Sequence, residues 1–543
     1  MHLKDALAIL DEIAFYLELK GENIFKINAF YNAVRNLSKY DVNLQEAFEK
    51  GIIENTKGVG KSILSVLNEI KEKGYTQLLI NLRSEFPSDI YSLTQIRGLG
   101  AKKIKKLFDE LNISNIVELE QACLENKLLL IPGFGEKTQK SILENIEKLK
   151  KSKGLVLLHR ADLIVNDIIL ILNKLGFNLF SVTGEIRLRK PIISKIEFVL
   201  VGEDERKINV LSKQLELQKN ENKLFGKTGD LELIFYLIDK ENFASKLLET
   251  TGPTHFLEKI NFKKFKNVNL KSEEELFNYL KIPFIPPPAR ENPNLEIKEY
   301  DFVHERDLKG LIHVHSNYSD GSNSIEEIAK YAKSLGYEYV LLCDHSKSAF
   351  YANGLDEIRL RQQWEEIEKV NSETSGITIL KGIECDILVD GSLDFSDDIL
   401  KQFDCVIASV HSRFNLSKEE MTKRITKALK NPYVKILGHL TGRLLLSRDP
   451  YQIDIEEIIK VVSQEGKSIE LNCDPHRLDI DWTYHQKLIE NKVPVTISLD
   501  AHSIDGFNYV KLGIDIATKG LLEKKHIVNC LSLKEFKNQF CVK

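Results

Sequence analysis

The 543-residue chain is long enough for three or four domains. Its composition is that of an ordinary globular protein, with 43% hydrophobic and 29% charged residues, and its formal net charge of −4 excludes a global basic field as a signal for nucleic acid. No apolar run approaches the roughly 18 residues of a membrane span, so we expect no membrane partner. The seven scattered cysteines form no CxxC pair, which disfavours a zinc ribbon or a disulfide framework and favours a reducing cytoplasm.

Residues 1–150 are predicted to be mostly helical, because apolar residues recur every three to four positions, as in LKDALAILDEIAFYLEL. Three short segments of this region resemble one another: TKGVGKSILSVL from Thr56, IRGLGAKKIKKLF from Ile96 and IPGFGEKTQKSIL from Ile131. Each contains Gly–apolar–Gly followed by a basic or polar helix. The glycines permit a tight turn, and the free N–H groups at the start of the next helix can hold a phosphate.

The repeated pattern resembles the helix-hairpin-helix motif, which binds the DNA backbone without reading its sequence. A glycine helix cap and solvated lysines would explain any single copy, but three copies with the same apolar framing favour DNA. The residues expected to contact DNA are Gly58, Gly60, Lys61, Gly98, Gly100, Lys102, Lys103, Gly133, Gly135 and Lys137.

Residues 155–280 mix helices with strand-like runs such as Ile196–Val201 and Leu231–Ile238, which predicts an α+β domain. The stretch KIPFIPPPARENPN at 281–294 contains five of the chain's 13 prolines and is interpreted as a stiff, extended linker. From about Leu308 the pattern changes to regular strand–helix alternation, which predicts a parallel sheet or barrel.

Each predicted strand of the C-terminal region ends in a polar side chain. In a closed parallel barrel the carboxyl ends of the strands converge on one mouth, so these side chains are expected to meet. The two histidines of the first run are one residue apart and should point to the same face of their strand. The seven runs are GLIHVH, YVLLCDH, ITILKGIE, CVIASVH, VKILGH, SIELNCD and VTISLDAH.

Histidine combined with carboxylate, without thiolate, favours Zn²⁺, Mn²⁺ or Fe²⁺. Nine candidates exceed what one ion can use, so two or three ions are expected with Glu384 as a bridge, although any single member could support a ligand instead. Such a cluster suits phosphoester hydrolysis. The candidate ligands are His313, His315, Asp320, His345, Glu384, His411, His439, Asp500 and His502.

The segments HVHSNYSDG, CDHS, GIECDIL, ASVHSRF, GHLTGRLL and LDAHS together resemble the PHP (polymerase and histidinol phosphatase) domain. The resemblance covers residues 308–535 and fills all nine of its metal-ligand positions. It implies a distorted (β/α)7 barrel with a trinuclear zinc or manganese site. It also suggests Arg413 and Arg443 as phosphate contacts, with surface salt bridges as the alternative. The residues expected to carry catalysis are His313, His315, Glu384, His411, Asp500, His502, Arg413 and Arg443.

The whole chain resembles the bacterial family X DNA polymerases (PolX), which place helix-hairpin-helix regions, a nucleotidyltransferase palm, a proline-marked linker and a PHP domain in this order. The fold class expected is therefore multidomain α/β, with a helical N-terminal region, an α+β palm and a C-terminal (β/α)7 barrel. The expected domains are an 8-kDa-like helical domain at 1–85, a fingers-like region at 86–152, the palm and thumb at 153–282, the linker at 283–307 and the PHP domain at 308–543.

The palm departs from the family pattern at its catalytic positions. Family palms bind the incoming triphosphate at a Gly-Ser and hold two Mg²⁺ ions with three aspartates. The matching positions here are Gly184, Glu185, Arg187, Lys195, Glu197 and Ile234.

A glutamate at 185 would repel a triphosphate, and a lysine at 195 puts positive charge where a cation should bind. Glu232, two residues from Ile234 and on the same face, is the alternative third carboxylate. We therefore expect no Mg²⁺ in the palm, and templated synthesis that is absent or vestigial.

The function predicted from these observations is that of a metal-dependent phosphoesterase acting on DNA ends in repair. We expect 3′–5′ exonuclease cleavage, with 3′-phosphatase activity and abasic-site incision as further options. The alternatives are an active polymerase with a proofreading PHP domain, a non-catalytic DNA-binding scaffold, and a small-molecule phosphoesterase of the histidinol phosphatase type. DNA is the expected partner, through its backbone, and no sequence signal fixes an oligomeric state.

Overall fold

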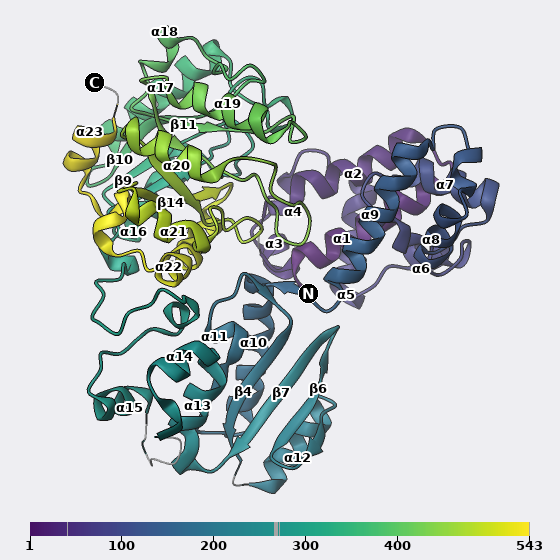
Figure 1. Ribbon diagram of the computed structural model, residues 1–543. Helices are drawn as coiled ribbons and strands as arrows, with labels where there is room; N and C mark the ends of the chain where they lie inside the picture. Colours follow the sequence, from purple (N-terminus) through teal and green to yellow (C-terminus); the bar gives the residue numbers. More distant parts are fainter. Residues whose placement is uncertain (41, 203, 265–269, 271, 542–543) are drawn as a thin grey trace. The chain divides into compact units, whose positions relative to one another are not determined.

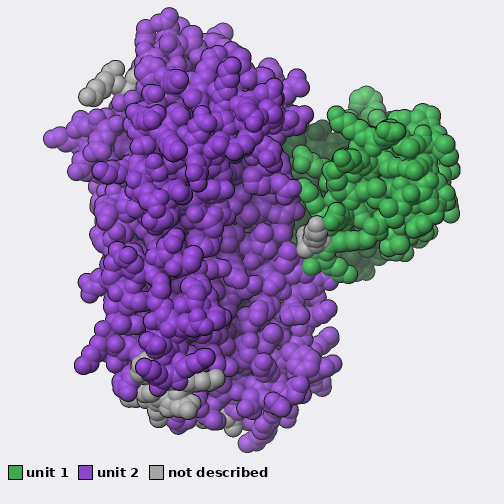
Figure 2. All heavy atoms as spheres, viewed as in Figure 1, with its two compact units in different colours: residues 1–153 green, residues 154–543 purple. Residues whose placement is uncertain are grey.

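The computed structural model describes residues 1–40, 42–202, 204–264, 270 and 272–541. Seven positions of the predicted palm at 153–282 and the last two positions of the predicted PHP domain therefore lie outside the described residues. The chain divides into two compact units, Met1–Lys153 and Gly154–Lys543 (Figure 2). In the described part of the chain, no helix is both long and apolar enough to cross a membrane.

Unit 1 is entirely helical, with α1 buried at its centre through residues such as Leu10 and Ile13. Glu12 of α1 accepts two hydrogen bonds from Arg83, at 2.6 and 2.7 Å, which fixes α6 against it. The elements are α1 (Leu3–Lys20), α2 (Ile24–Leu37), α3 (Leu44–Glu49), α4 (Ile52–Asn55), α5 (Lys61–Lys73), α6 (Gln77–Ser84), η1 (Ile90–Gln95), α7 (Ala101–Leu111), α8 (Ile116–Leu124), η2 (Lys127–Leu130) and α9 (Glu136–Ser152).

The three Gly–apolar–Gly segments form three similar hairpins. The first glycine of each has a left-handed backbone, with φ of +94° at Gly58, +87° at Gly98 and +94° at Gly133. A side chain would strain this turn, which explains why glycine stands there. The second glycine of each segment is the N-cap of the next helix, and the lysines predicted to flank DNA are exposed. The second glycines are Gly60, Gly100 and Gly135, and the lysines are Lys61, Lys102, Lys103 and Lys137.

The first part of unit 2 is a five-stranded sheet in the order β2-β4-β7-β6-β5, with β4 and β7 parallel and the other pairs antiparallel (Figure 1). The predicted strand Leu231–Ile238 is β7, and the predicted strand Ile196–Val201 is β4 extended by one residue. The core of the sheet includes the stacked rings of Phe198 and Phe235, whose centroids lie 5.2 Å apart. The strands are β2 (Phe180–Thr183), β4 (Lys195–Val201), β5 (Gln218–Asn220), β6 (Lys223–Thr228) and β7 (Leu231–Ile238), with a separate pair β1 (Val156–Leu157) and β3 (Ile192–Ile193).

The helices of this part are α10 (Leu158–Lys174), α11 (Gly184–Arg187), α12 (Glu205–Gln214), α13 (Phe243–Thr251), α14 (Thr254–Lys259) and α15 (Glu273–Leu280), with η3 (Lys240–Asn242) and η4 (Phe262–Lys264).

The proline-rich segment is packed rather than freely extended, which corrects the linker interpretation. Pro287–Glu291 forms the 3₁₀ helix η5, and the side chain of Arg290 is fully buried. Its guanidinium donates to both carboxylate oxygens of Glu273, at 2.8 and 3.0 Å, and to the Ile285 carbonyl at 2.9 Å. The buried carboxylate of Glu273 in α15 therefore holds this segment in place through Arg290.

The last part of unit 2 is a closed, all-parallel barrel of seven strands in the order β8-β9-β10-β11-β12-β13-β14 (Figure 1). The seven apolar runs predicted as strands are these seven strands. Their residues are almost all buried, as expected for strands covered by helices on the outside. The strands are β8 (Gly310–Val314), β9 (Tyr339–Leu342), β10 (Thr378–Asp386), β11 (Cys405–Ser409), β12 (Val434–Leu437), β13 (Ser468–Asn472) and β14 (Val495–Ala501).

The helices of the barrel part are α16 (Ile325–Ser334), α17 (Glu357–Glu373), α18 (Asp397–Leu400), α19 (Lys418–Leu429), α20 (Ile455–Gln464), α21 (His485–Glu490), α22 (Val510–Lys519) and α23 (Leu533–Phe540). The 3₁₀ turns are η6 (Glu305–Asp307), η7 (Phe350–Ala352), η8 (Trp482–Tyr484), η9 (Ile504–Tyr509), η10 (Lys524–His526) and η11 (Val528–Cys530).

Candidate metal centre

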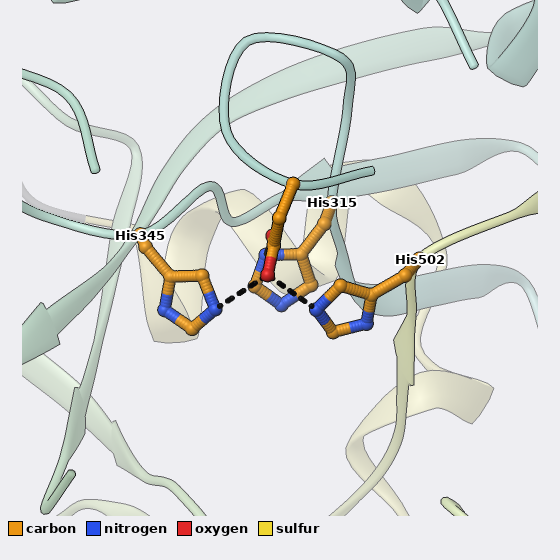
Figure 3. Close-up of side chains that lie close together, drawn as sticks. His315, His345 and His502 are labelled. Carbon is orange, nitrogen blue, oxygen red and sulfur yellow. Dashed lines mark ion pairs between the residues drawn. The ribbon is translucent and has the colours of Figure 1, made fainter. Parts of the chain in front are cut away.

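The nine predicted ligands come from the carboxyl ends of six barrel strands, β8, β9, β10, β11, β12 and β14, and from the loops that follow them. The structure brings all nine together at one mouth. Figure 3 shows the imidazole rings of His315, His345 and His502 around a single carboxylate. That carboxylate is Asp320, whose Oδ2 lies 3.7 Å from Nε2 of His345 and 3.3 Å from Nε2 of His502.

Glu384 lies at the centre of the cluster and is almost completely buried. Each of its carboxylate oxygens faces histidine nitrogens from different strands, which is the arrangement expected of a bridging ligand. Oε1 lies 3.0 Å from His439 Nε2 and 3.1 Å from His411 Nε2, and Oε2 lies 2.9 Å from His345 Nδ1, 3.5 Å from His313 Nε2 and 3.8 Å from His315 Nε2.

Three overlapping groups of these side chains have ligand atoms within 4.8 Å of one another and can each hold an ion. They are His315, Asp320, His345 and His502; His313, His315 and Asp500; and His345, Glu384 and His411.

Several of the ligand atoms are buried without a hydrogen-bond partner among the described residues, including Nε2 of His313, both ring nitrogens of His315 and Oε2 of Glu384. Unpaired buried polar atoms are costly, and bound cations would satisfy them. The residues present therefore fit a cluster of divalent ions.

Two strands depart from regular geometry where they carry ligands. His313 has φ of +66° beside a register shift between Ile312 and Val314, and Asp500 has φ of +50° beside a shift between Ser498 and Ala501. His313 and His315 both reach the cluster, but not through the simple strand alternation expected from their spacing, because a bulge reorients His313. Strained backbone of this kind is concentrated at functional sites.

Two carboxylates that the sequence reasoning did not single out support the ligands. Glu470, buried in β13, lies 2.6 Å from Nδ1 of His313 and accepts a 3.0 Å hydrogen bond from the His439 amide. Asp386 lies 2.5 Å from Nδ1 of His411. Such contacts fix the ring so that Nε2 faces the cluster. The available signal for Glu470 was an acidic residue inside the otherwise apolar run SIELN.

The two arginines suggested as phosphate contacts differ in their surroundings. Arg443 donates to the carbonyls of Arg477 and Leu478 and to Asp481, so its guanidinium is engaged within the protein, as in the salt-bridge alternative. Arg477 does reach it: its Nε lies 3.5 Å from Asp500, and Nε and Nη1 have no hydrogen-bond partner in the described part of the chain. Arg413 is exposed, two residues after His411.

The cluster shifts the protonation of its own members. Burial would raise the pKa of Glu384, but His411 and His313 outweigh it and hold this pKa well below its usual value. Burial would lower the pKa of His411, but the charges of Glu384 and Asp386 raise it to about 10. Burial lowers the pKa of His315 to about 4, helped by the neighbouring His502. Histidine ligands must be neutral, so cations entering this cluster displace protons.

In the five-stranded sheet, an ion pair occupies the positions that the family resemblance aligns with metal-binding carboxylates. Lys195 Nζ lies 3.0 Å from Glu197 Oε1, and the Tyr236 hydroxyl donates to the same oxygen at 2.7 Å. A Cβ at Gly184 would meet Glu197 Oε2 at 2.0 Å, so Glu197 fills the space beside that glycine. Ile234 pairs in register with Glu197, and the exposed Glu232 pairs with Lys195.

The other two palm positions are also paired within the protein. Glu185 accepts hydrogen bonds from the Ser194 amide and hydroxyl, at 2.7 and 2.9 Å. Arg187 donates to both oxygens of Glu273, at 2.9 and 2.7 Å. This ion pair links Arg187 of α11 to Glu273 of α15.

Comparison with protein families assigns three segments of the chain. Residues 312–474 match the PHP domain, residues 1–76 match a helix-hairpin-helix domain and residues 90–148 match a SAM-like helix-hairpin-helix tandem. Shorter similarity links the chain to probable phosphatases, at 34% identity over 165 residues in Thermoanaerobacter sp. and 31% over 167 residues in Acetivibrio thermocellus. These two matches cover 30% of this chain, and 62% and 63% of the phosphatases.

One relative matches along almost the whole chain. The DNA polymerase/3′-5′ exonuclease PolX of Bacillus subtilis is 33% identical over an alignment 567 positions long, which covers 98% of both proteins. With its helix-hairpin-helix regions, its PHP domain and this end-to-end similarity, the chain belongs to the bacterial PolX family.

Proposed function

We propose that this protein is a metal-dependent phosphoesterase that shortens DNA from the 3′ end. The observation that carries the proposal is Glu384, whose two oxygens face five histidines in a buried cluster. A carboxylate shared in this way suits two or three ions spaced for phosphoester hydrolysis. The similarity to a named 3′-5′ exonuclease and to probable phosphatases supports the same chemistry.

The donor set favours Zn²⁺ or Mn²⁺, because it contains imidazole and carboxylate but no thiolate. The nine ligands proposed from the sequence would hold these ions. Bound there, the ions would offset charge on a phosphoryl oxygen and lower the pKa of a water. Glu470 and Asp386 orient the rings of His313 and His411 for this purpose.

The proposed phosphate contacts are Arg477 and Arg413. The Nε of Arg477 lies 3.5 Å from Asp500, so the charge of this guanidinium can attract a phosphate to the edge of the cluster. A guanidinium fork is well suited to this contact. Exposed Arg413 can approach the strand from the loop after β11.

Unit 1 is proposed to hold the DNA backbone. Its hairpins expose helix N-termini behind glycines, and a Cβ at Gly98, Gly100, Gly133 or Gly135 would meet nothing within 4 Å. Open space at a helix N-terminus lets a phosphate approach the free N–H groups. The seven cysteines are all free, which supports a place in the reducing cytoplasm.

The palm is proposed to scaffold or guide the strand rather than to polymerise. Lys195 neutralises Glu197 at the position where a cation would be needed, and Ile234 cannot ligate one. Of the two activities in the name of the Bacillus subtilis relative, we therefore propose only the exonuclease, and not the DNA polymerase, for this chain.

An end-labelled primer–template with Mn²⁺, with and without dNTPs, tests the proposal. We expect shortening by the wild-type protein and by a His255→Ala control, whose histidine is exposed and lies on α14. A His315→Ala variant should not shorten the primer. Extension with dNTPs would favour a polymerase, and turnover of a small phosphate monoester without turnover of DNA would favour a small-molecule phosphoesterase. An unchanged primer despite DNA binding would indicate a scaffold.

A further inference from the structure

We propose that Phe350 and Tyr351 form an aromatic platform that stacks the bases of an unpaired DNA strand beside the metal centre. This inference rests on the proposed function, because it assigns a substrate class, single-stranded ends, to the same site. The two side chains are carried by η7, in the loop that follows His345.

The platform is unusual in its exposure. Phe350 is 88% exposed and Tyr351 is 72% exposed, whereas Ala349 and Ala352 on either side are each 1% exposed. The turn therefore buries its two small side chains and presents its two large aromatic ones to solvent. Isolated exposed apolar residues are common on protein surfaces, but two consecutive exposed aromatic residues in the loop that follows a predicted metal ligand suggest a binding surface.

The exposure is not the result of a loosely held loop. Ser348 donates to Asp394 through its amide and its hydroxyl, at 2.7 and 2.6 Å. The Leu355 amide donates to the His345 carbonyl at 2.8 Å and closes the loop at its base. A Cβ at Gly354 would lie 1.9 Å from the Ser346 carbonyl oxygen, so the two ends of the loop are in direct contact. The rings are thus presented by a fixed backbone.

The platform adjoins the cluster directly. The ring of Tyr351 lies 6.2 Å from the ring of His345, which itself faces Glu384 and Asp320. A nucleotide whose phosphate lies at the cluster would therefore have its base within reach of the Tyr351 ring, and Phe350 precedes it in the same turn. Every base has a π face, so stacking would be independent of sequence, in keeping with hairpins that grip only the backbone.

An unpaired strand is the occupant that fits best. Bases inside a duplex are stacked on their neighbours and offer no free face, whereas those of a single-stranded or frayed end do. The platform would therefore select frayed ends and help to separate the last nucleotides from the template before cleavage.

The test uses a single-stranded oligonucleotide with 2-aminopurine at its 3′ end, whose fluorescence falls on stacking. Binding is measured with the metal-loaded, full-length protein, and phosphorothioate linkages at the 3′ end of the oligonucleotide slow its cleavage. We expect quenching by the wild-type protein, and a loss of quenching with roughly 5- to 100-fold weaker binding for Phe350→Ala/Tyr351→Ala. Tyr351→Phe should retain the quenching, while Phe350→Leu/Tyr351→Leu should lose it, since leucine is apolar but cannot stack. Tyr279→Ala, a 54% exposed tyrosine on α15, is the control and should behave as the wild type.

Equal quenching by wild-type protein and the double alanine variant would overturn the proposal, as would quenching retained by the double leucine variant. The hydrolysis of p-nitrophenyl phosphate, a monoester without a base, separates this failure from that of the proposed function. Retained monoester turnover with lost single-strand binding supports the platform. If the wild-type protein hydrolysed no p-nitrophenyl phosphate but its single-strand binding still depended on the two rings, the phosphoesterase proposal would be refuted and the platform would stand.

Discussion

The Nε–H group of Arg443 donates a 2.8 Å hydrogen bond to the carbonyl oxygen of Arg477. Two further groups of Arg443 bind Leu478 and Asp481, so this arginine holds the loop from which Arg477 reaches Asp500. The arginine that the sequence suggested as a phosphate contact thus holds the loop of a second arginine, Arg477, which lies beside the predicted ligand Asp500.

Replacing Arg477 with glutamine should reduce kcat/KM on DNA by about 10- to 100-fold, because a charge-assisted hydrogen bond to phosphate contributes roughly 1.5–3 kcal/mol. Bound metal and melting temperature should stay near wild-type values. Arg443→Gln should lower the melting temperature and the activity together, since it releases the loop. Full activity in Arg477→Gln would remove this residue from the site.

Replacing Glu470 with glutamine should weaken metal binding by about 10- to 100-fold, because the His313 ring and the His439 amide lose their buried carboxylate. Competition with a chromophoric chelator measures the affinity. Glu368→Gln is the matched control: this glutamate pairs with Lys381 on the barrel surface and is 70% exposed. An unchanged affinity in Glu470→Gln would show that the contact does not serve the ions.

Acid should destabilise the packing of α15 against η5 through Glu273. Burial would raise the pKa of this carboxyl, but Arg290 and Arg187 lower it from the usual 4.5 of a glutamate to about 2. Its contribution, ~3 kcal/mol from the shift, is therefore fully present above pH 4.5 and is lost as the pH falls towards 2. Denaturant unfolding between pH 7 and 3 measures it.

Glu273→Gln should flatten this pH dependence and lower stability at pH 7, because it leaves two arginines without their carboxylate. The neighbouring Glu274→Gln, at an exposed position, should keep the wild-type profile. If Glu273→Gln were as stable as the wild type at neutral pH, the buried pair would have no role in holding η5.

The palm should add no nucleotide. In the His315→Ala background, where product is not degraded, a gapped primer–template with Mg²⁺ and dNTPs should give no extension, because the Lys195–Glu197 pair replaces a metal-binding pair of aspartates. Gel analysis of the labelled primer measures this. Extended product would show that Glu197 and Glu232 suffice to hold Mg²⁺.

The barrel and its ligands could be predicted because their signals are local. Each strand is an apolar run, and closure of the barrel brings the polar ends of the runs together, as with His439 just after β12. The direction of the Arg443 side chain depends on a loop from another strand, which no local pattern encodes. The linker was misjudged for a similar reason: Arg290 is buried among Phe256, Phe277 and Phe284, rings supplied by separate segments.

The most direct test of the account is the metal content of the purified protein, measured together with cleavage of a labelled primer. We predict two or three equivalents of zinc or manganese per chain, loss of cleavage when a chelator removes them, and recovery when Mn²⁺ is returned. Protein that contains no bound metal and that gains no phosphoester cleavage from added Mn²⁺ or Zn²⁺ would contradict it.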